Sequence, residues 1–431
     1  MDSSSSLPDP FPAPSASAVS GSLRPPSSKS VSLRALNLAL IGGRRLEIRD
    51  LLIADDTRYF LVALETLGWT VEEDGGVWVL EPPSAPVRSA TIDCGESGTM
   101  MRFLIAAMST MSGRWRLDGR SRLRERPVGA LVDTLRRLGA DIAYLGQEGC
   151  APLQVEGGSL EGGEVEVAAS ESSQYVSALA MAALRASGPI GIRVTSLTSA
   201  PYVDLTVSVL REAGADVRVT GAGLSIHPGN TTWDAIGIEG DFSAAAYPAA
   251  AAVLIGGLVE LEGLERTSAQ GDARFLDLLV AVGAEVSWHE NTVQVLGTGT
   301  LRGLEVDLSR MPDQVPTLAA MAPFLEGETR IRNVAHLRIK ESDRLHAMAV
   351  GLESLGVPVR ELDDGLVVEG VWAQRPPPDS EVTVNPFGDH RIAMSMALAG
   401  LRRPGVRIAD PGVVGKSYPG FWKDWEGLIS A

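Results

Sequence analysis

The sequence has 431 residues, of which 45% are hydrophobic and 21% are charged, a composition typical of a soluble globular protein. This length predicts two domains rather than a single core. Asp and Glu outnumber Lys and Arg by 54 to 38, and the resulting net charge of −16 argues against nucleic acid or an anionic membrane as the main partner. An anionic small molecule would need local cations that act against this overall charge.

The first 22 residues are rich in Ser and Pro and contain no apolar run of signal-peptide length, so we predict a disordered tail over residues 1–22. A transit peptide is not indicated, because the tail carries Asp2 and Asp9 and no Arg. Later apolar stretches are too short to span a bilayer. The two cysteines, Cys94 and Cys150, lack metal-ligand spacing, which favours a reducing, cytoplasmic location.

Two patterns recur along the chain with a period of about 70 residues. One is the end of an amphipathic helix, a Gly and a β-rich run, with the glycines at Gly68, Gly139, Gly214, Gly283 and Gly356. The other marks the starts of small-residue helices at Ser30, Ser97, Ser173, Asp241, Asp313 and Asp389. Together they predict six strand–helix–strand–helix–strand units of an α/β protein.

The two helices of each unit differ in character. The first is apolar nearly all round, which is typical of a helix inside a core. The second has one apolar stripe and one charged face, and these helices are predicted to begin at Asp55, Arg126, Pro201, Gly271, Glu341 and Ser417. We therefore expect three units per domain, with buried helices inside and sheets outside.

The stretch SSKSVSLR, residues 27–34, contains the first candidate site. Ser28 or Ser30 would cap the following helix, and Lys29 and Arg34 would lie beside its N-terminus. A cation there opposes the helix dipole unless an anion is bound nearby. The alternative is a solvated Lys and Arg on a surface helix.

The same arrangement recurs in later units. Gly95 and Gly98 could let backbone N–H groups approach a phosphate. Cations stand near several predicted helix starts, namely Lys29, Arg34, Arg126, Lys340, Arg344, Arg391 and Lys416. Together they predict a site that binds several anionic groups.

In LRIKESDRL, Glu341 and Arg344 are three residues apart, which by itself could be an ordinary helix ion pair. With Asp313, however, Glu341 provides the two carboxyl groups that proton transfer in two directions requires.

The motifs SSKSVSLRAL, GESGTMMR, RERPVG, SSQYVSALAMAA, MPDQVPTLAAMA, LRIKESDRL, GDHRIAM and GKSYPGF resemble those of the 5-enolpyruvylshikimate-3-phosphate (EPSP) synthase family, from about Arg24 to the C-terminus. The resemblance implies a two-domain inside-out α/β barrel of six βαβαββ units. The chain would cross between the domains near Lys29 and Glu239. One domain would comprise residues 29–238 and carry most shikimate 3-phosphate contacts, and the other residues 23–28 plus 239–431, with the catalytic acids.

The resemblance implies transfer of the enolpyruvyl group of phosphoenolpyruvate to the 5-hydroxyl of shikimate 3-phosphate, with release of phosphate and without metal or organic cofactor. It implies that Asp313 takes the proton from the attacking hydroxyl and that Glu341, with Lys29, delivers one to the methylene carbon. We expect a monomer whose domains close on these small anionic substrates.

The resemblance also assigns the substrate contacts. Shikimate 3-phosphate would be bound by Lys29, Ser30, Arg34, Ser172, Ser173, Gln174, Ser199, Tyr202, Asp313 and Lys340. Phosphoenolpyruvate would be bound by Lys29, Gly98, Arg126, Gln174, Arg344, Arg391 and Lys416.

The sequence departs from the family at three positions. Ser28 stands where Gly is usual, and Glu96 and His336 stand where Asn is usual or common. Because a carboxylate near phosphoenolpyruvate would repel it, we expect Glu96 to be neutralised by Arg126 or Arg102 or to point away from the pocket.

Two alternatives stay open, a related enzyme and a protein of a different functional class. One is the sister enolpyruvyl transferase that acts on UDP-N-acetylglucosamine, although this chain lacks the Cys often found before the Arg-Pro pair of that enzyme. The other is a catalytically inactive anion-binding homologue, against which stands the complete set of acids and bases.

Overall fold

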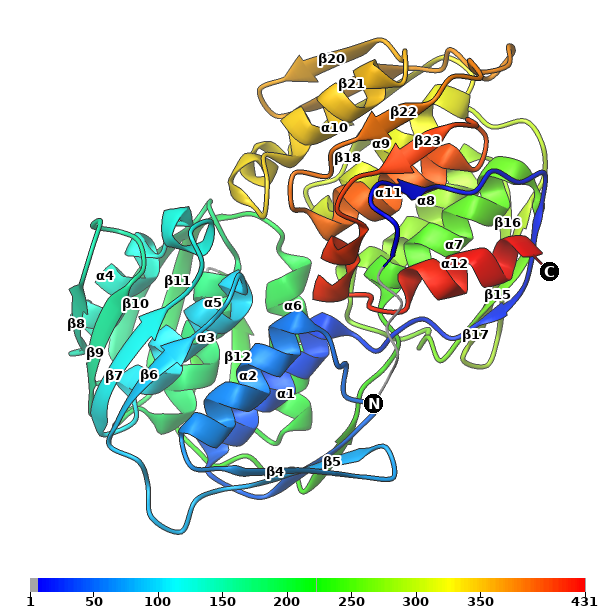
Figure 1. Ribbon diagram of the computed structural model, residues 1–431. Helices are drawn as coiled ribbons and strands as arrows, with labels where there is room; N and C mark the ends of the chain where they lie inside the picture. Colours follow the sequence, from blue (N-terminus) through cyan, green and yellow to red (C-terminus); the bar gives the residue numbers. More distant parts are fainter. Residues whose placement is uncertain (1–6, 222, 431) are drawn as a thin grey trace. The chain divides into compact units, whose positions relative to one another are not determined.

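The computed structural model describes residues 7–221 and 223–430. The chain divides into two compact units. Unit 1 comprises Met1–Pro26 and Gly240–Ala431, and unit 2 comprises Ser27–Glu239. The chain therefore passes from one unit to the other twice, after Pro26 and after Glu239 (Figure 1).

The described part of unit 2 contains three four-stranded sheets with the same design. The sheet orders are β14-β3-β5-β4, β6-β7-β9-β8 and β10-β11-β13-β12, and in each the first pair is parallel and the others antiparallel. The strands are β3 (Leu46–Arg49), β4 (Thr70–Asp74), β5 (Val77–Glu81), β6 (Ser89–Asp93), β7 (Gly113–Asp118), β8 (Asp141–Tyr144), β9 (Leu153–Gly157), β10 (Gly163–Ala169), β11 (Ile190–Leu197), β12 (Val217–Thr220), β13 (Gly223–Ile226) and β14 (Ala235–Gly237).

The described part of unit 1 repeats this design in the sheets β2-β15-β17-β16 and β18-β19-β21-β20, and its third sheet, β22-β23-β1, has three strands. Their parallel pairs are β2 with β15, β18 with β19 and β22 with β23. The strands are β1 (Phe11–Pro12), β2 (Val19–Leu23), β15 (Gly257–Glu262), β16 (Ala284–His289), β17 (Thr292–Gly297), β18 (Glu305–Asp307), β19 (Glu328–Arg332), β20 (Val359–Leu362), β21 (Gly365–Glu369), β22 (Val382–Val384) and β23 (Val406–Ile408).

Three helices in each unit are buried nearly all round and contact one another, as their apolar sequences predict. They are α1 (Lys29–Gly42), α3 (Gly98–Ser109) and α5 (Gln174–Ala182) in unit 2, and α7 (Phe242–Ile255), α9 (Val315–Met321) and α11 (His390–Gly400) in unit 1. The second helices are α2 (Asp55–Thr66), α4 (Gly129–Arg137), α6 (Pro201–Glu212), α8 (Phe275–Val282), α10 (Arg344–Ser354) and α12 (Phe421–Ser430). The predicted α/β fold of six related units is confirmed.

The predicted glycines and capping residues lie at the ends of these helices. All five glycines of the recurring pattern have positive φ, between 82° and 126°, the backbone region that ends helices and favours Gly. Ser28, Ser97, Asp241 and Asp389 cap α1, α3, α7 and α11 through side-chain oxygens.

The predicted disordered tail is wrong over residues 7–22, while residues 1–6 lie outside the described residues. Strand β1 pairs antiparallel with β23 to complete the third sheet of unit 1, and β2 pairs parallel with β15 (Figure 1). The Phe11 ring is 5% exposed and lies 4.3 Å from the Trp422 ring, centroid to centroid. Ser and Gly dominate β2 because most of its side chains face away from the core, so its composition carried little strand signal.

Four of the second helices begin three or four residues later than predicted, whereas α2 and α6 begin at the predicted Asp55 and Pro201. Pro127 holds the preceding Arg126 extended, with ψ at 129°, and Asp343 caps α10. Arg126, Glu341 and Lys416 therefore lie on the segments before their helices rather than in a first turn.

The packing of the N-terminal segment gives a stability prediction. Phe11→Ala should lower the free energy of unfolding of unit 1 by roughly 3 kcal/mol, because the substitution leaves a cavity against Trp422. Leu7→Ala is the matched control, since Leu7 is 41% exposed. Urea unfolding followed by tryptophan fluorescence measures both, and equal effects of the two substitutions would show that the segment contributes no packing energy.

Candidate active site

In unit 2, the start of α1 carries the first predicted cation. The Val31 N–H donates to the Ser28 hydroxyl at 3.4 Å, so Ser28, not Ser30, caps this helix. The Lys29 ammonium lies 3.5 Å from the carboxylate of Asp56 on α2, and both side chains are largely buried. Lys29 is therefore held in place beside the helix N-terminus.

Arg34 lies one turn further along α1 and is 2% exposed. It donates to three neutral acceptors: Nε to the Thr206 hydroxyl at 2.9 Å, Nη1 to the Ser30 carbonyl at 2.8 Å and Nη2 to the Tyr202 carbonyl at 2.9 Å. Burial lowers the pKa of Arg34 to about 10. No carboxylate among the described residues pairs with Arg34, so an anion nearby would compensate its charge.

The start of α3 brings two arginines against a glycine. A Cβ at Gly98 would lie 2.6 Å from Arg126 Cζ and 2.7 Å from Arg102 Nη1, so a larger residue at this position would displace both guanidiniums. Arg102 donates to the Gln174 side-chain oxygen at 2.6 Å and to the Pro127 carbonyl at 3.0 Å. These contacts bring the predicted Gly98, Arg126 and Gln174 together in one unit.

Hydroxyl groups surround the starts of α5 and α6. The Ser172 hydroxyl accepts from the Gln174 N–H at 3.3 Å, and Gln174 Nε2 donates to the Thr99 hydroxyl at 2.8 Å. Ser199, just before α6, has a φ of 55°, a left-handed conformation that is costly for a residue with a side chain. Ser172, Ser173 and Ser199 are all buried.

In unit 1, Arg344 joins three carboxylates. Nη1 donates to Asp313 at 2.8 Å, Nη2 to Glu341 at 2.9 Å and Nε to Asp389 at 2.8 Å. Arg344 is 2% exposed. Burial lowers its pKa, but the charges of the three carboxylates outweigh burial and raise that pKa above its usual value, so the guanidinium stays charged.

Two more cations belong to this cluster. Arg391 Nη2 donates to the second oxygen of Asp313 at 2.7 Å, and the Lys416 ammonium lies 3.9 Å from Glu341. The charges of three carboxylates (Asp313, Glu341 and Asp389) and three cations (Arg344, Arg391 and Lys416) sum to zero. The structure therefore brings together the predicted Asp313, Glu341, Arg344, Arg391 and Lys416.

His336, one of the departures from the family pattern, lies on η6 (Ala335–Ile339) and is 7% exposed. Burial, and after it the charge of Lys340, lower the pKa of His336 to about 4. His336 is therefore neutral at physiological pH. Glu96 is half-buried between Gly95 and Ser97, and its expected cation partner stays a prediction.

The sequence interpretation missed Asp56 and Asp389 as partners of site cations. Asp56 is buried at the start of α2, spaced four and eight residues from the buried Phe60 and Leu64. An acidic residue on the apolar face of a helix is the signal that would have found it. Asp389 caps α11 and also pairs with Arg344, so its position at a helix start was only half of its role.

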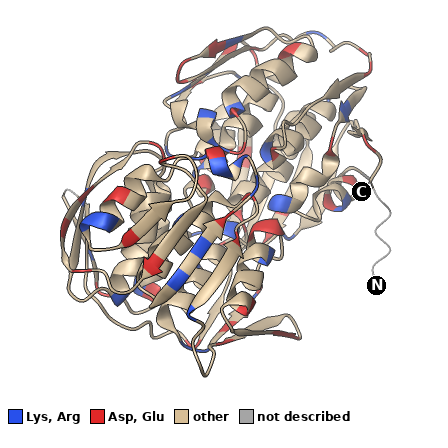
Figure 2. Cartoon of the chain, turned by 60° about the vertical axis from the view of Figure 1, so that its left-hand side comes forward, with Lys and Arg blue, Asp and Glu red and all other residues tan. Residues whose placement is uncertain are grey.

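Figure 2 shows Lys and Arg interspersed with Asp and Glu over both units. The net charge of −16 is therefore the sum of a mixed distribution, and the candidate cations gather at the helix starts described above.

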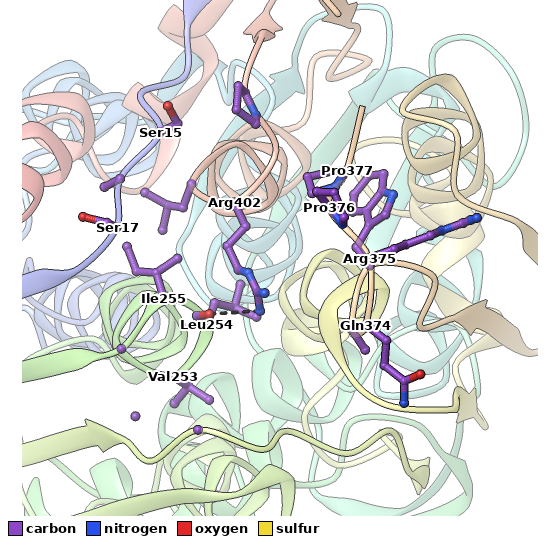
Figure 3. A pocket seen from close by; sticks show the side chains of 18 of the residues that line it. Ser15, Ser17, Val253, Leu254, Ile255, Gln374, Arg375, Pro376, Pro377 and Arg402 are labelled. Carbon is purple, nitrogen blue, oxygen red and sulfur yellow. Dashed lines mark hydrogen bonds between the residues drawn. The ribbon is translucent and has the colours of Figure 1, made fainter. Parts of the chain in front are cut away.

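A cavity of about 1070 Å³ lies at the C-terminal ends of α7 and α11 in unit 1. Figure 3 shows Arg402 between Ser15 and Ser17 on one side and Gln374, Pro376 and Pro377 on the other. Arg402 donates to the Leu254 carbonyl at 3.3 Å, the place where a cation stabilises a helix C-terminus. None of the predicted substrate-binding residues lines this cavity.

The buried His336 gives a pH prediction. Because its pKa is lower in the folded state than in the unfolded chain, the unfolded state binds the extra proton, and stability falls as the pH drops from about 6.5 towards 4. Wild type should therefore lose about 2 kcal/mol more than His336→Asn between pH 7 and pH 5.

Urea unfolding at both pH values measures this difference. The control is His289→Asn, because His289 is exposed at the end of β16, and this substitution should leave the pH dependence as in wild type. Identical curves for wild type and His336→Asn would mean that burial does not exclude the proton.

Comparison with known proteins connects this geometry with a family. Residues 14–425 match the model of the family described as EPSP synthase (3-phosphoshikimate 1-carboxyvinyltransferase). A 3-phosphoshikimate 1-carboxyvinyltransferase of Syntrophobacter fumaroxidans is 44% identical over 96% of this chain and 98% of its own length. That of Cupriavidus taiwanensis is 40% identical over 95% of this chain and 96% of its own length.

Solved structures agree with the sequence matches. EPSP synthase from Acinetobacter baumannii superposes with a TM-score of 0.81 at 27% identity, covering 97% of both chains. The enolpyruvyl transferase NikO from Streptomyces tendae shares the fold, with a TM-score of 0.77 at 20% identity over 96% of both chains. With a family model matched over nearly its whole length and curated relatives at up to 44% identity among those compared, the chain belongs to the EPSP synthase family.

Proposed function

We propose that this chain transfers the enolpyruvyl group of phosphoenolpyruvate to the 5-hydroxyl of shikimate 3-phosphate and releases phosphate. The observation that carries the proposal is the pair of carboxylates, Asp313 and Glu341, which both accept from the buried guanidinium of Arg344. Addition of a hydroxyl group to the enol phosphate double bond, followed by elimination of phosphate, needs one group that accepts a proton and one that donates it. Membership of the EPSP synthase family supplies the substrate class.

Shikimate 3-phosphate is proposed to contact both units. In unit 2 the buried charge of Arg34 and the ammonium of Lys29 would attract its anionic groups, and the hydroxyls around α5 and α6 would donate to them. In unit 1 its 5-hydroxyl would approach Asp313. The proposed contacts are Lys29, Ser30, Arg34, Ser172, Ser173, Gln174, Ser199, Tyr202, Asp313 and Lys340.

Phosphoenolpyruvate is proposed to be held by guanidiniums and ammonium groups of both units. Gly98 leaves space for Arg126 to lie against the start of α3, where backbone N–H groups would also bind an anion. The proposed contacts are Lys29, Gly98, Arg126, Gln174, Arg344, Arg391 and Lys416.

The charge balance of the unit 1 cluster suggests how proton transfer is coupled to binding. Without substrate, Arg344 and Lys416 stabilise the ionised form of Glu341. When anionic groups of phosphoenolpyruvate take over these cations, Glu341 loses that stabilisation and its proton affinity rises. A protonated Glu341 could then donate to the methylene carbon, assisted by Lys29.

Asp313 is proposed to accept the proton of the attacking hydroxyl. Arg344 and Arg391 each bind one of its oxygens, which fixes the plane of the carboxylate. Its side chain is 21% exposed, whereas that of Asp389 is fully buried, so of these two carboxylates Asp313 is the one a substrate can reach. The cations that remain near the cluster would stabilise the departing phosphate.

The cytoplasmic location and the monomeric state belong to the same proposal. The two cysteines, Cys94 and Cys150, are buried and free, which agrees with a reducing compartment.

The substrate assignment is tested by phosphate release. Purified protein with phosphoenolpyruvate should release phosphate when shikimate 3-phosphate is added and not when UDP-N-acetylglucosamine replaces it. Release with UDP-N-acetylglucosamine alone would assign the sister transferase activity, and absence of release with either would indicate an inactive homologue.

The roles of the two carboxyls are tested by removing their charges. Asp313→Asn and Glu341→Gln should each lower kcat by roughly 10²-fold or more, while KM changes far less. The reason is that each group accepts or donates a proton in the transition state. Glu353→Gln on the exposed side of α10 makes the same chemical change outside the cluster and should leave kcat unaltered.

Steady-state kinetics in both substrates separates the outcomes. A rise in KM with kcat retained would make Asp313 and Glu341 binding residues, and full activity of Glu341→Gln would reduce its contact with Arg344 to an ordinary ion pair.

A further inference from the structure

Behind the unit 1 cluster lies a carboxyl group that the proposed mechanism does not use. Asp272 belongs to η3 (Gly271–Arg274), the turn that leads into α8, and is 4% exposed. Its spacing to the buried Phe275, Leu276 and Leu279 places it on the apolar face of that helix. Acidic side chains are rarely buried unless a partner or a function compensates the cost.

The contacts of Asp272 connect it with the cluster. The hydroxyl of Ser243, in the first turn of α7, donates to its Oδ2. Gln314, which directly follows Asp313 on η4 (Pro312–Gln314), is fully buried. Arg391 binds Asp313 at 2.7 Å, and its positive charge also acts on Asp272, whose pKa it lowers. The positive charge of the Arg391 guanidinium therefore acts on both Asp272 and Asp313.

The environment of Asp272 makes its charge adjustable near neutral pH. Burial, and after it the negative charge of Asp313, raise its pKa to about 6, whereas Arg391 and Ser243 oppose that rise. It is thus mostly ionised at pH 7.5 and mostly neutral at pH 5. Two nearby carboxyl groups repel each other when both are ionised. The charge of Asp272 therefore alters the proton affinity of Asp313.

We propose that Asp272 is a positioning residue that keeps Asp313 basic enough to accept the proton of the attacking hydroxyl. This inference rests on the role of Asp313 proposed above. When Asp272 is ionised, its charge opposes that of Asp313, and transfer of a proton to Asp313 relieves the repulsion. When Asp272 is neutral, the two guanidiniums on Asp313 act without this opposition, and Asp313 becomes a weaker base.

The other charged or titratable groups on the elements around Asp272 are as follows. On α7, Asp241 caps the helix through the Ala244 N–H, and Tyr247 faces Arg391 and Arg344 with its pKa raised by burial to about 12. On its own turn and helix, Arg274 and Asp277 are exposed. From η4 and α11, the groups that face it are Asp313 and Arg391.

Two substitutions that should change the pH dependence of kcat in different ways test the proposal. In wild type, kcat should fall as the pH drops through about 6, because Asp272 takes up a proton there. Asp272→Asn should lack this step and have a kcat about tenfold lower at pH 7.5, with KM for phosphoenolpyruvate changed less than threefold.

Ser243→Ala removes a hydrogen bond to the charged form of Asp272 and should therefore raise its pKa. The step in kcat should move to higher pH by about half a unit or more, while kcat at pH 8.5 stays near the wild-type value. Asp277→Asn makes the same chemical change as Asp272→Asn five residues away on an exposed position and should leave the pH profile unaltered.

Profiles of kcat and KM from pH 5 to 9, with melting temperatures for every variant, decide the result. A wild-type step that persists in Asp272→Asn would overturn the proposal, as would a rise in KM with kcat retained, which would mean that Asp272 only orients Arg391. A loss of melting temperature with an unshifted profile would make it a structural residue. If Asp313→Asn retained full kcat, the proposed base itself would be wrong, which is a separate outcome.

Discussion

The burial of the Arg344 guanidinium is the constraint on which the site of unit 1 depends. Removing an ion from water costs several kcal/mol, and only close, well-aligned counter-charges offset that cost. Asp313, Glu341 and Asp389 provide them from three separate segments, and Ser342 also donates to Asp389 at 3.1 Å. Because Asp389 is also the cap of α11, the starts of α10 and α11 are fixed to each other through one side chain.

Unit 2 buries its cation differently, with different consequences for binding. Arg34 donates to a hydroxyl and two carbonyls, so no carboxylate among its described partners balances its charge, and burial lowers its pKa. In the proposed function, an anion near Arg34 gains the full interaction, whereas an anion near Arg344 competes with carboxylates already in place. Unit 2 is therefore suited to binding, and unit 1 to proton transfer that accompanies binding.

Sequence patterns predicted the repeated part of this fold well, because helix caps and terminal glycines depend on local backbone geometry. Gly139 and Gly214 have the predicted positive φ, and Ser97 and Asp241 cap the predicted helices. The N-terminal segment was mispredicted because β1 and β2 are stabilised by pairing with strands hundreds of residues away.

The candidate site divides in the same way. Charged residues at helix starts could be listed from sequence, and the pairing of Glu341 with Arg344 was expected from their three-residue spacing. The pairing of each acid with its cation depends on contacts between different βαβαββ repeats, such as that of Asp313 with Arg391 within unit 1. Asp272 was not singled out from the sequence, although its spacing to Phe275 and Leu279 places it on the buried face.

The buried cations also explain how an acidic protein can bind anions. Arg34, Arg126, Arg344, Arg391 and Lys416 are each less than 7% exposed in a chain with net charge −16. Surface charges more than about 8 Å away are largely screened at physiological ionic strength, so the acidic surface acts weakly on a bound ligand. The desolvation of these five cations is completed during folding, so a substrate does not have to displace their hydration shells. Local burial, rather than the sum of charges, therefore decides which ligands the site accepts.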